Sequence, residues 1–173
     1  MSIVEQFVAN NERYASSFQG PLPLPPAKQI AVVACMDARF SVYGALGLKE
    51  GDAHVIRNAG GLVDDMTMRS LVISQRLLGT RTIVLIHHSD CGMLTFTDDE
   101  LRRALIDDVG FAPSYAFGAF KDLEEDLRAA AERIRHDPFL LHRDDVHGFV
   151  IDVASGKLQP VDLSAPQKVG SRA

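Results

Sequence analysis

The sequence has no long apolar segment, no excess of basic residues and only two cysteines among its 173 residues. Its longest apolar runs, such as Ile30–Met36 and Ile83–Ile86, are much shorter than the roughly 20 residues that a membrane-spanning helix needs. The N-terminus has no basic stretch followed by an apolar one, which argues against a secretory signal. We therefore expect no membrane partner and a cytoplasmic location.

The net charge and the small number of cysteines limit the possible partners and functions further. A net charge of -5 and a pI near 5.6 argue against a nucleic-acid partner, because nucleic-acid binders usually carry a basic face. Cys35 and Cys91 could form one disulfide in a secreted protein, whereas an intracellular protein more often uses sparse cysteines for metal binding or catalysis. The absence of an export signal favours metal binding or catalysis.

The chain is predicted to contain one globular domain with an extension at each end. The 46% hydrophobic content suits a core of ordinary size. Residues 1–26 are interpreted as an N-terminal helical arm, with a helix at 4–18, and a Pro-rich spacer at 20–26 that cannot be helical. Residues 27–163 are interpreted as an α/β domain, and 164–173 as a flexible tail. An arm on a stiff spacer is well suited to packing on a partner subunit.

Short apolar runs alternate with helical patterns between residues 27 and 163. Strands are predicted at 29–34, 53–57, 81–87, 146–153 and 158–161, and helices at 41–48, 64–78, after the capping box 97–100, and at 121–136. This alternation predicts a central, mostly parallel β-sheet flanked by helices. In such sheets ligands bind beyond the carboxyl ends of the strands.

Three metal-binding side chains follow two of these strands. Cys35 closes the first strand, and His88 and Cys91 come directly after the strand at 81–87. If the two strands are neighbours, the three side chains converge, and a set of two thiolates and one imidazole favours zinc. Taken separately, a buried cysteine at a strand end is usually only a small hydrophobe. The joint position of all three favours one zinc ion with a fourth position free for water.

A carboxylate and a guanidinium follow the first of these residues. Residue alternation places Cys35, Asp37 and Arg39 on one side of an extended loop. Asp37 can accept a hydrogen bond from metal-bound water or bind the metal itself, and Arg39 can hold it in a bidentate pair. An ordinary loop salt bridge is the alternative, and the position beside a metal ligand makes it the less favoured one.

Two neighbours of the metal-binding residues receive supporting roles. Strand alternation points His87 away from His88, so we expect His87 to lie in the core or behind the site. Asp90 lies between His88 and Cys91 and could orient His88 or Arg39.

The motifs Cys35-x-Asp37-x-Arg39 and His88-x-x-Cys91-Gly92 together resemble the paired signature of the β-class carbonic anhydrases. The intervening Val55-Ile-Arg-Asn-Ala-Gly60 is also similar to that family, and the similarity runs from about Pro25 to Phe96. The short bacterial and archaeal members are the most similar. The resemblance implies zinc-dependent, reversible hydration of carbon dioxide to bicarbonate and a proton through zinc-bound hydroxide.

The resemblance also implies roles for single residues. It places one zinc ion per chain on Cys35, His88 and Cys91. It makes Asp37 and Arg39 the catalytic pair, with Asp37 as a fourth metal ligand in a closed state only. It implies a homodimer or a dimer of dimers, with the N-terminal helix laid across the partner.

Asn58, Ala59 and Gly60 of the intervening motif are assigned to substrate binding. We expect them to shape the pocket through the main chain, since glycine permits close approach.

Three other readings stay open. The same site could hydrolyse carbon disulfide or carbonyl sulfide. A noncatalytic zinc or bicarbonate-binding module would have lost the Asp37–Arg39 pair, which this sequence keeps. The third is a thiol redox protein, which would not explain His88 and for which the sequence has no C-x-x-C pair.

Overall fold

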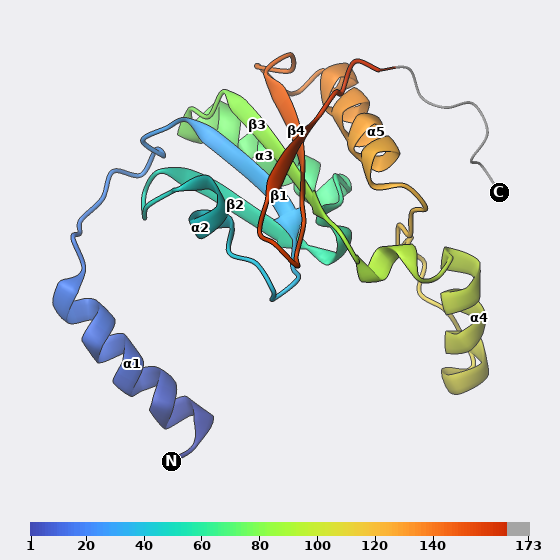
Figure 1. Cartoon of the computed structure of the whole chain (residues 1–173), viewed down its shortest axis with the longest axis horizontal. Coiled ribbons are helices and arrows are strands. Elements are labelled where there is room, and N and C mark those ends of the chain that lie inside the picture. Colours follow the sequence, from blue (N-terminus) through green and yellow to red (C-terminus); the bar gives the residue numbers. More distant parts are fainter. Residues whose placement is uncertain (166–173) are drawn as a thin grey trace.

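A computed structural model describes residues 1–165, and these residues form a five-stranded sheet flanked by helices (Figure 1). The strands lie in the order β2-β1-β3-β4-β5. Their bounds are β1 Ile30–Cys35, β2 Ala53–Asn58, β3 Thr82–His88, β4 Val146–Ile151 and β5 Leu158–Val161. The first four run parallel and β5 is antiparallel to β4, which confirms the mostly parallel sheet that the sequence predicts.

The helices begin and end within a few residues of the predicted positions. They are α1 Ile3–Ser17, α2 Val42–Leu46, α3 Asp65–Leu78, α4 Asp98–Val109 and α5 Leu123–His136, with short 3₁₀ turns η1 Ala59–Gly61 and η2 Gly92–Leu94. Local chemistry explains these ends: Thr97 and Glu100 form the predicted capping box of α4, and Gly79 ends α3 in a left-handed conformation. Among residues 1–165, none of the helices combines the length and apolar character that crossing a membrane requires.

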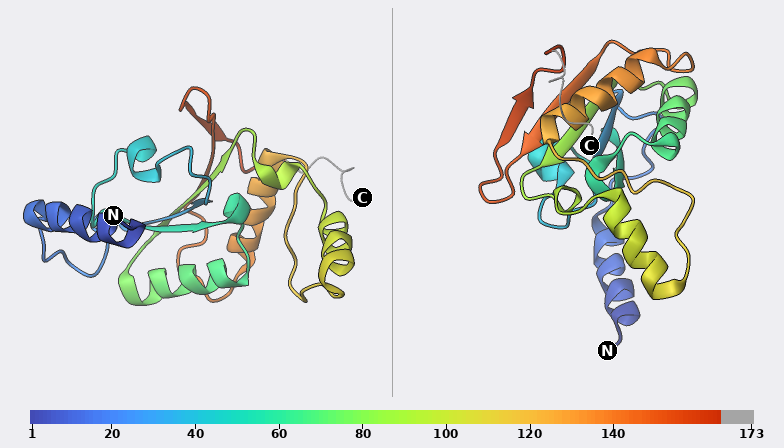
Figure 2. Two further views of the ribbon diagram at one scale, coloured as in Figure 1. Left: turned by 90° about the horizontal axis from the view of Figure 1, so that it is seen from below. Right: turned by 90° about the vertical axis from the view of Figure 1, so that its right-hand side faces the viewer.

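The two faces of the sheet are covered unequally. Helices α3 and α5 pack on one face, and Figure 2 shows the short α2 on the other. The first face carries the main core, in which Leu71, Leu85 and Leu127 are almost fully buried. On the second face Val32 is buried, but Phe149 packs around it with part of its surface exposed. The sheet therefore presents one closed face and one partly covered face.

Two segments extend away from this body. Helix α1 is joined to it by the extended segment that follows residue 18, and α4 projects from the opposite side (Figure 1). No residue of α1 is buried. The division into an arm at 1–26 and a domain at 27–163 stays a prediction, and most of the predicted tail, 166–173, lies outside the described residues.

Strand order brings the carboxyl ends of β1, β2 and β3 to one edge of the sheet. Strand β1 lies between the other two, and Cys35 at its end pairs with Asn58 at the end of β2. Gly61 then packs directly on the main chain at this edge, with a φ of 70° that favours glycine. A Cβ atom on Gly61 would lie 2.8 Å from the backbone nitrogen of Cys35 and 3.2 Å from the carbonyl oxygen of Ile86.

Gly61→Ala is therefore expected to lower the free energy of unfolding by about 2–4 kcal/mol, through left-handed strain and overlap with rigid main chain. Chemical denaturation of the metal-free proteins measures the change. Gly156→Ala is the matched control, because Gly156 also has a positive φ of 72° but no described atom within 4 Å of the added Cβ. The control should lose only about 1–2 kcal/mol, and equal losses would contradict the close-packing argument.

Candidate metal centre

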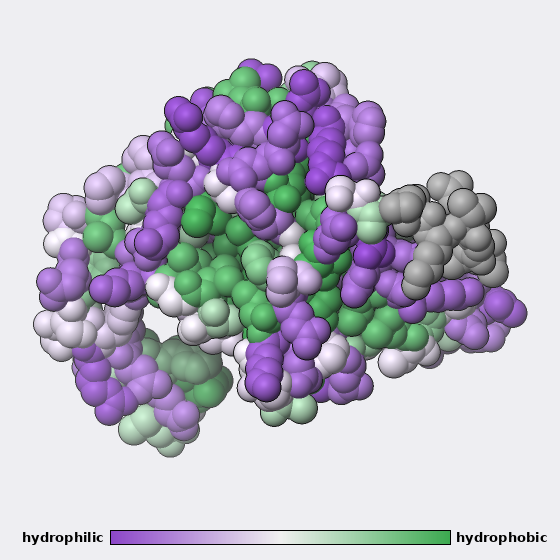
Figure 3. Space-filling view, turned by 45° about the horizontal axis from the view of Figure 1, so that its top comes forward, coloured by the Kyte–Doolittle hydropathy of each residue, from purple (hydrophilic) through white to green (hydrophobic). Residues whose placement is uncertain are grey.

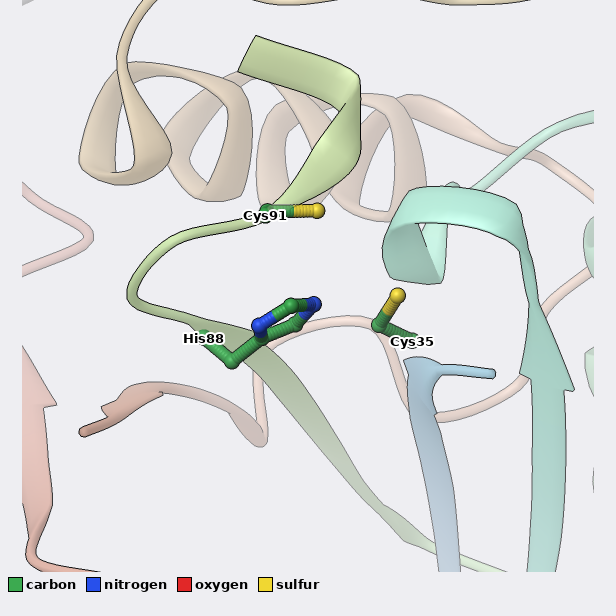
Figure 4. Close-up of side chains that lie close together, drawn as sticks. All are labelled: Cys35, His88 and Cys91. Carbon is green, nitrogen blue, oxygen red and sulfur yellow. The ribbon is translucent and has the colours of Figure 1, made fainter. Parts of the chain in front are cut away.

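Cys35, His88 and Cys91 come together at the carboxyl edge of the sheet (Figure 4). Cys35 is the last residue of β1, His88 is the last residue of β3, and Cys91 lies just before η2. Their metal-binding atoms all lie within 4.8 Å of one another. The three residues are only 5%, 1% and 2% exposed. The structure thus brings together the three side chains that the sequence spacing selects.

The hydrogen bonds of His88 leave one ring nitrogen ready for a metal. Nδ1 donates to the carbonyl oxygen of Ser89 at 2.9 Å, which leaves the lone pair on Nε2. Nε2 is buried and has no hydrogen-bond partner among the described residues. A buried polar atom without a partner is costly, and a metal ion would satisfy it. Two sulfur atoms and one imidazole nitrogen match zinc in a site with one open position.

The surroundings of Cys91 make this centre depend on a cation. Burial raises the pKa of the Cys91 thiol to about 11, and the neighbouring Cys35 adds to the rise. Metals bind the thiolate form, so a bound cation must supply the charge that displaces this proton.

The predicted pair of Asp37 and Arg39 is formed beside the three donors. The Arg39 side chain donates from Nε and Nη2 to both Asp37 carboxylate oxygens at 2.8–3.1 Å, and its backbone N–H donates at 2.8 Å. These hydrogen bonds hold the pKa of Asp37 well below its usual range, so the carboxylate is ionised. Asp37 Oδ2 lies 3.8 Å from His88 Nε2.

Asp90 contacts Arg39 and not His88. Nη1 of Arg39 donates to Asp90 Oδ2 at 2.6 Å, and Nη2 donates to the Asp90 carbonyl oxygen at 2.8 Å. Of the two partners that the sequence allows for Asp90, the structure selects the arginine.

Arg57 holds the metal-binding loop, a role that its place in the sequence does not predict. Its Nε donates to the carbonyl oxygen of Cys35 at 2.8 Å, and Nη2 donates to that of Asp37 at 2.5 Å. The guanidinium also lies 4.9 Å from the centre of the Phe40 ring. The only sequence signal was its place in the motif at 55–60, which gives no contact partner.

The residues assigned to substrate binding have other contacts in this structure. Asn58 Nδ2 donates a hydrogen bond to the Leu62 carbonyl oxygen at 2.8 Å, and the Leu62 backbone N–H donates to Asn58 Oδ1 at 2.7 Å. Gly60 is buried, and a Cβ there would lie 2.9 Å from Met93 Cγ. Asn58 and Ala59 line a cavity of about 540 Å³ next to α5, and none of the three metal-binding residues lines it. A direct role of 58–60 in substrate binding stays a prediction.

His87 points into the other side of the sheet. It is 1% exposed, its Nε2 lies 2.8 Å from Asp126 Oδ2, and its ring stacks on Phe120 at 5.0 Å. This places His87 in the core behind the site, as strand alternation predicts.

A mostly parallel sheet flanked by helices, with a buried Cys-His-Cys group at the carboxyl ends of its strands, places this chain among the zinc-binding α/β proteins. Residues 30–111 match the family model described as carbonic anhydrase. The sequence is 56% identical over 161 residues to β-carbonic anhydrase 1 of Mycobacterium tuberculosis, covering 93% of this chain and 99% of that protein. The chain therefore belongs to the β-carbonic anhydrase family.

Two further similar proteins have different named activities. The crystal structure of a carbonic anhydrase from Streptococcus mutans superposes with a TM-score of 0.87 at 40% identity, covering 94% of this chain and 99% of that chain. A carbon disulfide hydrolase of Acidithiobacillus thiooxidans is 30% identical over 192 residues, covering 99% of this chain and 96% of that protein.

Zinc binding to the metal-free protein should release protons and tighten as the pH rises. With the Cys91 pKa at about 11, this thiol is protonated near neutral pH. Each proton released makes the apparent affinity rise about tenfold per pH unit between roughly pH 6 and 8. Calorimetry in two buffers with different ionisation enthalpies counts the protons. Cys91→Ser should lose zinc, and a pH-independent affinity would contradict the expectation.

Proposed function

We propose that this protein catalyses the reversible hydration of carbon dioxide to bicarbonate and a proton. The observation that carries the proposal is an ionised carboxylate, Asp37, beside three buried metal-binding side chains in a chain of this family. Bound zinc supplies a Lewis acid that makes a nucleophile available from water near neutral pH. The chain's own residues hold that metal and orient the water.

Cys35, His88 and Cys91 would hold the zinc ion, and their burial keeps competing water away. Asp37 is proposed as a catalytic residue. Because its carboxylate is ionised, it can only accept hydrogen bonds, so a water in the site must turn a proton towards Asp37 and a lone pair towards the substrate. Arg39 acts through Asp37 by keeping the carboxylate charged and in one position.

Asp37→Ala is expected to lower the hydration rate by about 10- to 100-fold while zinc stays bound, because the change removes the water-orienting carboxylate and none of the three metal-binding side chains. Stopped-flow hydration assays and metal analysis measure the two quantities. Asp107→Ala, an exposed aspartate on α4, is the control for charge loss. A zinc-loaded wild-type protein without hydration activity would reject the proposed function, and loss of zinc from Asp37→Ala would make Asp37 chiefly a ligand.

Carbon disulfide or carbonyl sulfide is the alternative substrate class. Similarity to carbon disulfide hydrolases over almost the whole chain supports keeping this alternative. The same enzyme preparation, assayed with carbon dioxide and with each sulfur analogue, separates the two activities. A noncatalytic zinc or bicarbonate-binding module predicts no turnover of any of them.

We also propose a homodimer, or a dimer of such dimers, formed through α1. Val4, Phe7 and Val8 are 65%, 63% and 57% exposed, and Phe7 and Val8 lie about one helical turn after Val4 on the same stripe. Figure 3 shows hydrophobic side chains on the inner side of this helix and in the middle of the body. Apolar surface of this extent is typical of an interface, and a second copy would cover both the stripe and the partly covered sheet face.

We propose a cytoplasmic location because both cysteines are free thiols. Cys35 and Cys91 are free and buried, and zinc binding needs both as reduced thiols. A reducing compartment maintains this state, and the protein is therefore best suited to the cytoplasm.

Phe7→Glu should weaken the dimer by about 100-fold or more, since each copy loses about 1.5–3 kcal/mol of apolar burial. Gln6→Glu adds the same charge to the neighbouring exposed position and serves as the control. Light scattering coupled to size-exclusion chromatography over a dilution series measures the equilibrium. An unchanged dimer in Phe7→Glu, or a wild-type monomer, would contradict the α1 interface.

A further inference from the structure

The Arg39 guanidinium is held from two sides. On one side it donates to Asp37, in the loop after β1. On the other side it donates to the carboxylate and the carbonyl oxygen of Asp90, in the turn after β3. Arg39 therefore joins the two loops that carry the metal-binding residues.

The backbone of Asp90 has an unusual conformation that makes this double contact possible. Asp90 has a φ of 53°, one of two positive values at non-glycine residues in the described part of the chain. Aspartate and asparagine tolerate this conformation better than most residues. In this conformation the carboxylate and the carbonyl oxygen of one residue reach the same guanidinium, at 2.6 and 2.8 Å.

The Asp90 contact is poorly placed to stabilise the fold. The side chains of Asp90 and Arg39 are 79% and 45% exposed, and exposed ion pairs add little to global stability. Its effect is local, because Arg39 is the partner of both Asp37 carboxylate oxygens.

The Asp37 carboxylate needs such a restraint because it lies close to the metal position. Its Oδ2 is 3.8 Å from Nε2 of His88, which is the unpartnered nitrogen of the site. A carboxylate released from Arg39 would be a fourth donor for the metal and would occupy the position that water needs.

We propose that Asp90 is a positioning residue: by anchoring Arg39, it keeps the Asp37 carboxylate on Arg39 and away from the metal. The inference rests on the proposed function, since a free fourth position matters only where water must enter. It assigns Asp90 no contact with metal or substrate. Its action passes through Arg39 to Asp37.

Asp90→Asn tests this inference with little change to the main chain. Asparagine accepts the positive φ and keeps the carbonyl contact, so the charge of the carboxylate is what is removed. The variant should hydrate carbon dioxide about 3- to 10-fold more slowly in kcat, with zinc bound as tightly as in the wild type or up to about 10-fold more tightly. A merely structural role of Asp90 predicts lower zinc affinity in the variant, because a loosened turn between His88 and Cys91 would weaken zinc binding.

Zinc affinity is measured by competition with a chromophoric chelator at fixed pH, in the wild type, Asp90→Asn, Asp37→Ala and the double variant. In the Asp37→Ala background, Asp90→Asn should change neither zinc affinity nor the residual rate, because the carboxylate on which it acts is absent. Asp107→Asn on α4 is the control for the change in net charge and should behave as the wild type.

Asp90→Glu restores the charge at a longer reach and should recover part of the rate. Weaker zinc binding in Asp90→Asn, an unchanged rate, or a full effect that persists in the Asp37→Ala background would each overturn the proposal. The zinc measurements do not depend on turnover. A failure of the proposed function in the wild-type hydration assay is therefore distinguishable from a failure of this inference.

Discussion

The parallel pairing of β1 with β3 is the constraint on which the site depends. It places Cys35 and His88 at the same edge of the sheet and within reach of Cys91, which follows a short turn. Burial of this site without a cation is unfavourable because it leaves Nε2 of His88 without a partner, whereas the Cys91 thiol stays neutral until a metal displaces its proton. Without metal, the fold therefore leaves a buried polar atom unsatisfied at the sheet edge, and metal binding would satisfy it.

Two arginines shape the loop that leaves β1, and they act on different parts of it. Arg57 donates to main-chain carbonyl groups and so fixes the path of the loop between Cys35 and Phe40. Arg39 donates to the carboxylates of Asp90 and Asp37 and so holds these two negative charges in place. The metal-binding cysteine and the ionised aspartate are separated by one residue; Arg57 contacts the main chain of both, and Arg39 contacts the aspartate carboxylate. This division lets the loop hold a buried thiol and a charged carboxylate at adjacent places.

The sheet and the three metal-binding residues could be predicted because their signals are local. β-branched runs identify strands, and Cys35, His88 and Cys91 belong to residue types that bind metals. Arg57 and Gly61 could not be found in this way. Arg57 donates to carbonyl groups, which every residue has, and Gly61 meets main-chain atoms of residues distant in sequence. Asp90 was ambiguous because His88 and Arg39 were both plausible partners, and only the conformation of the turn decides between them.

Helix α1 has a consequence for how the protein responds to dilution. None of its residues is buried within its own chain, so the proposed second molecule would supply most of the stabilisation that its apolar stripe can give. In the proposed homodimer, the free energy of unfolding contains a term that grows with the logarithm of protein concentration. Thermal midpoints from samples at different concentrations would differ even when sequence, metal and buffer are the same.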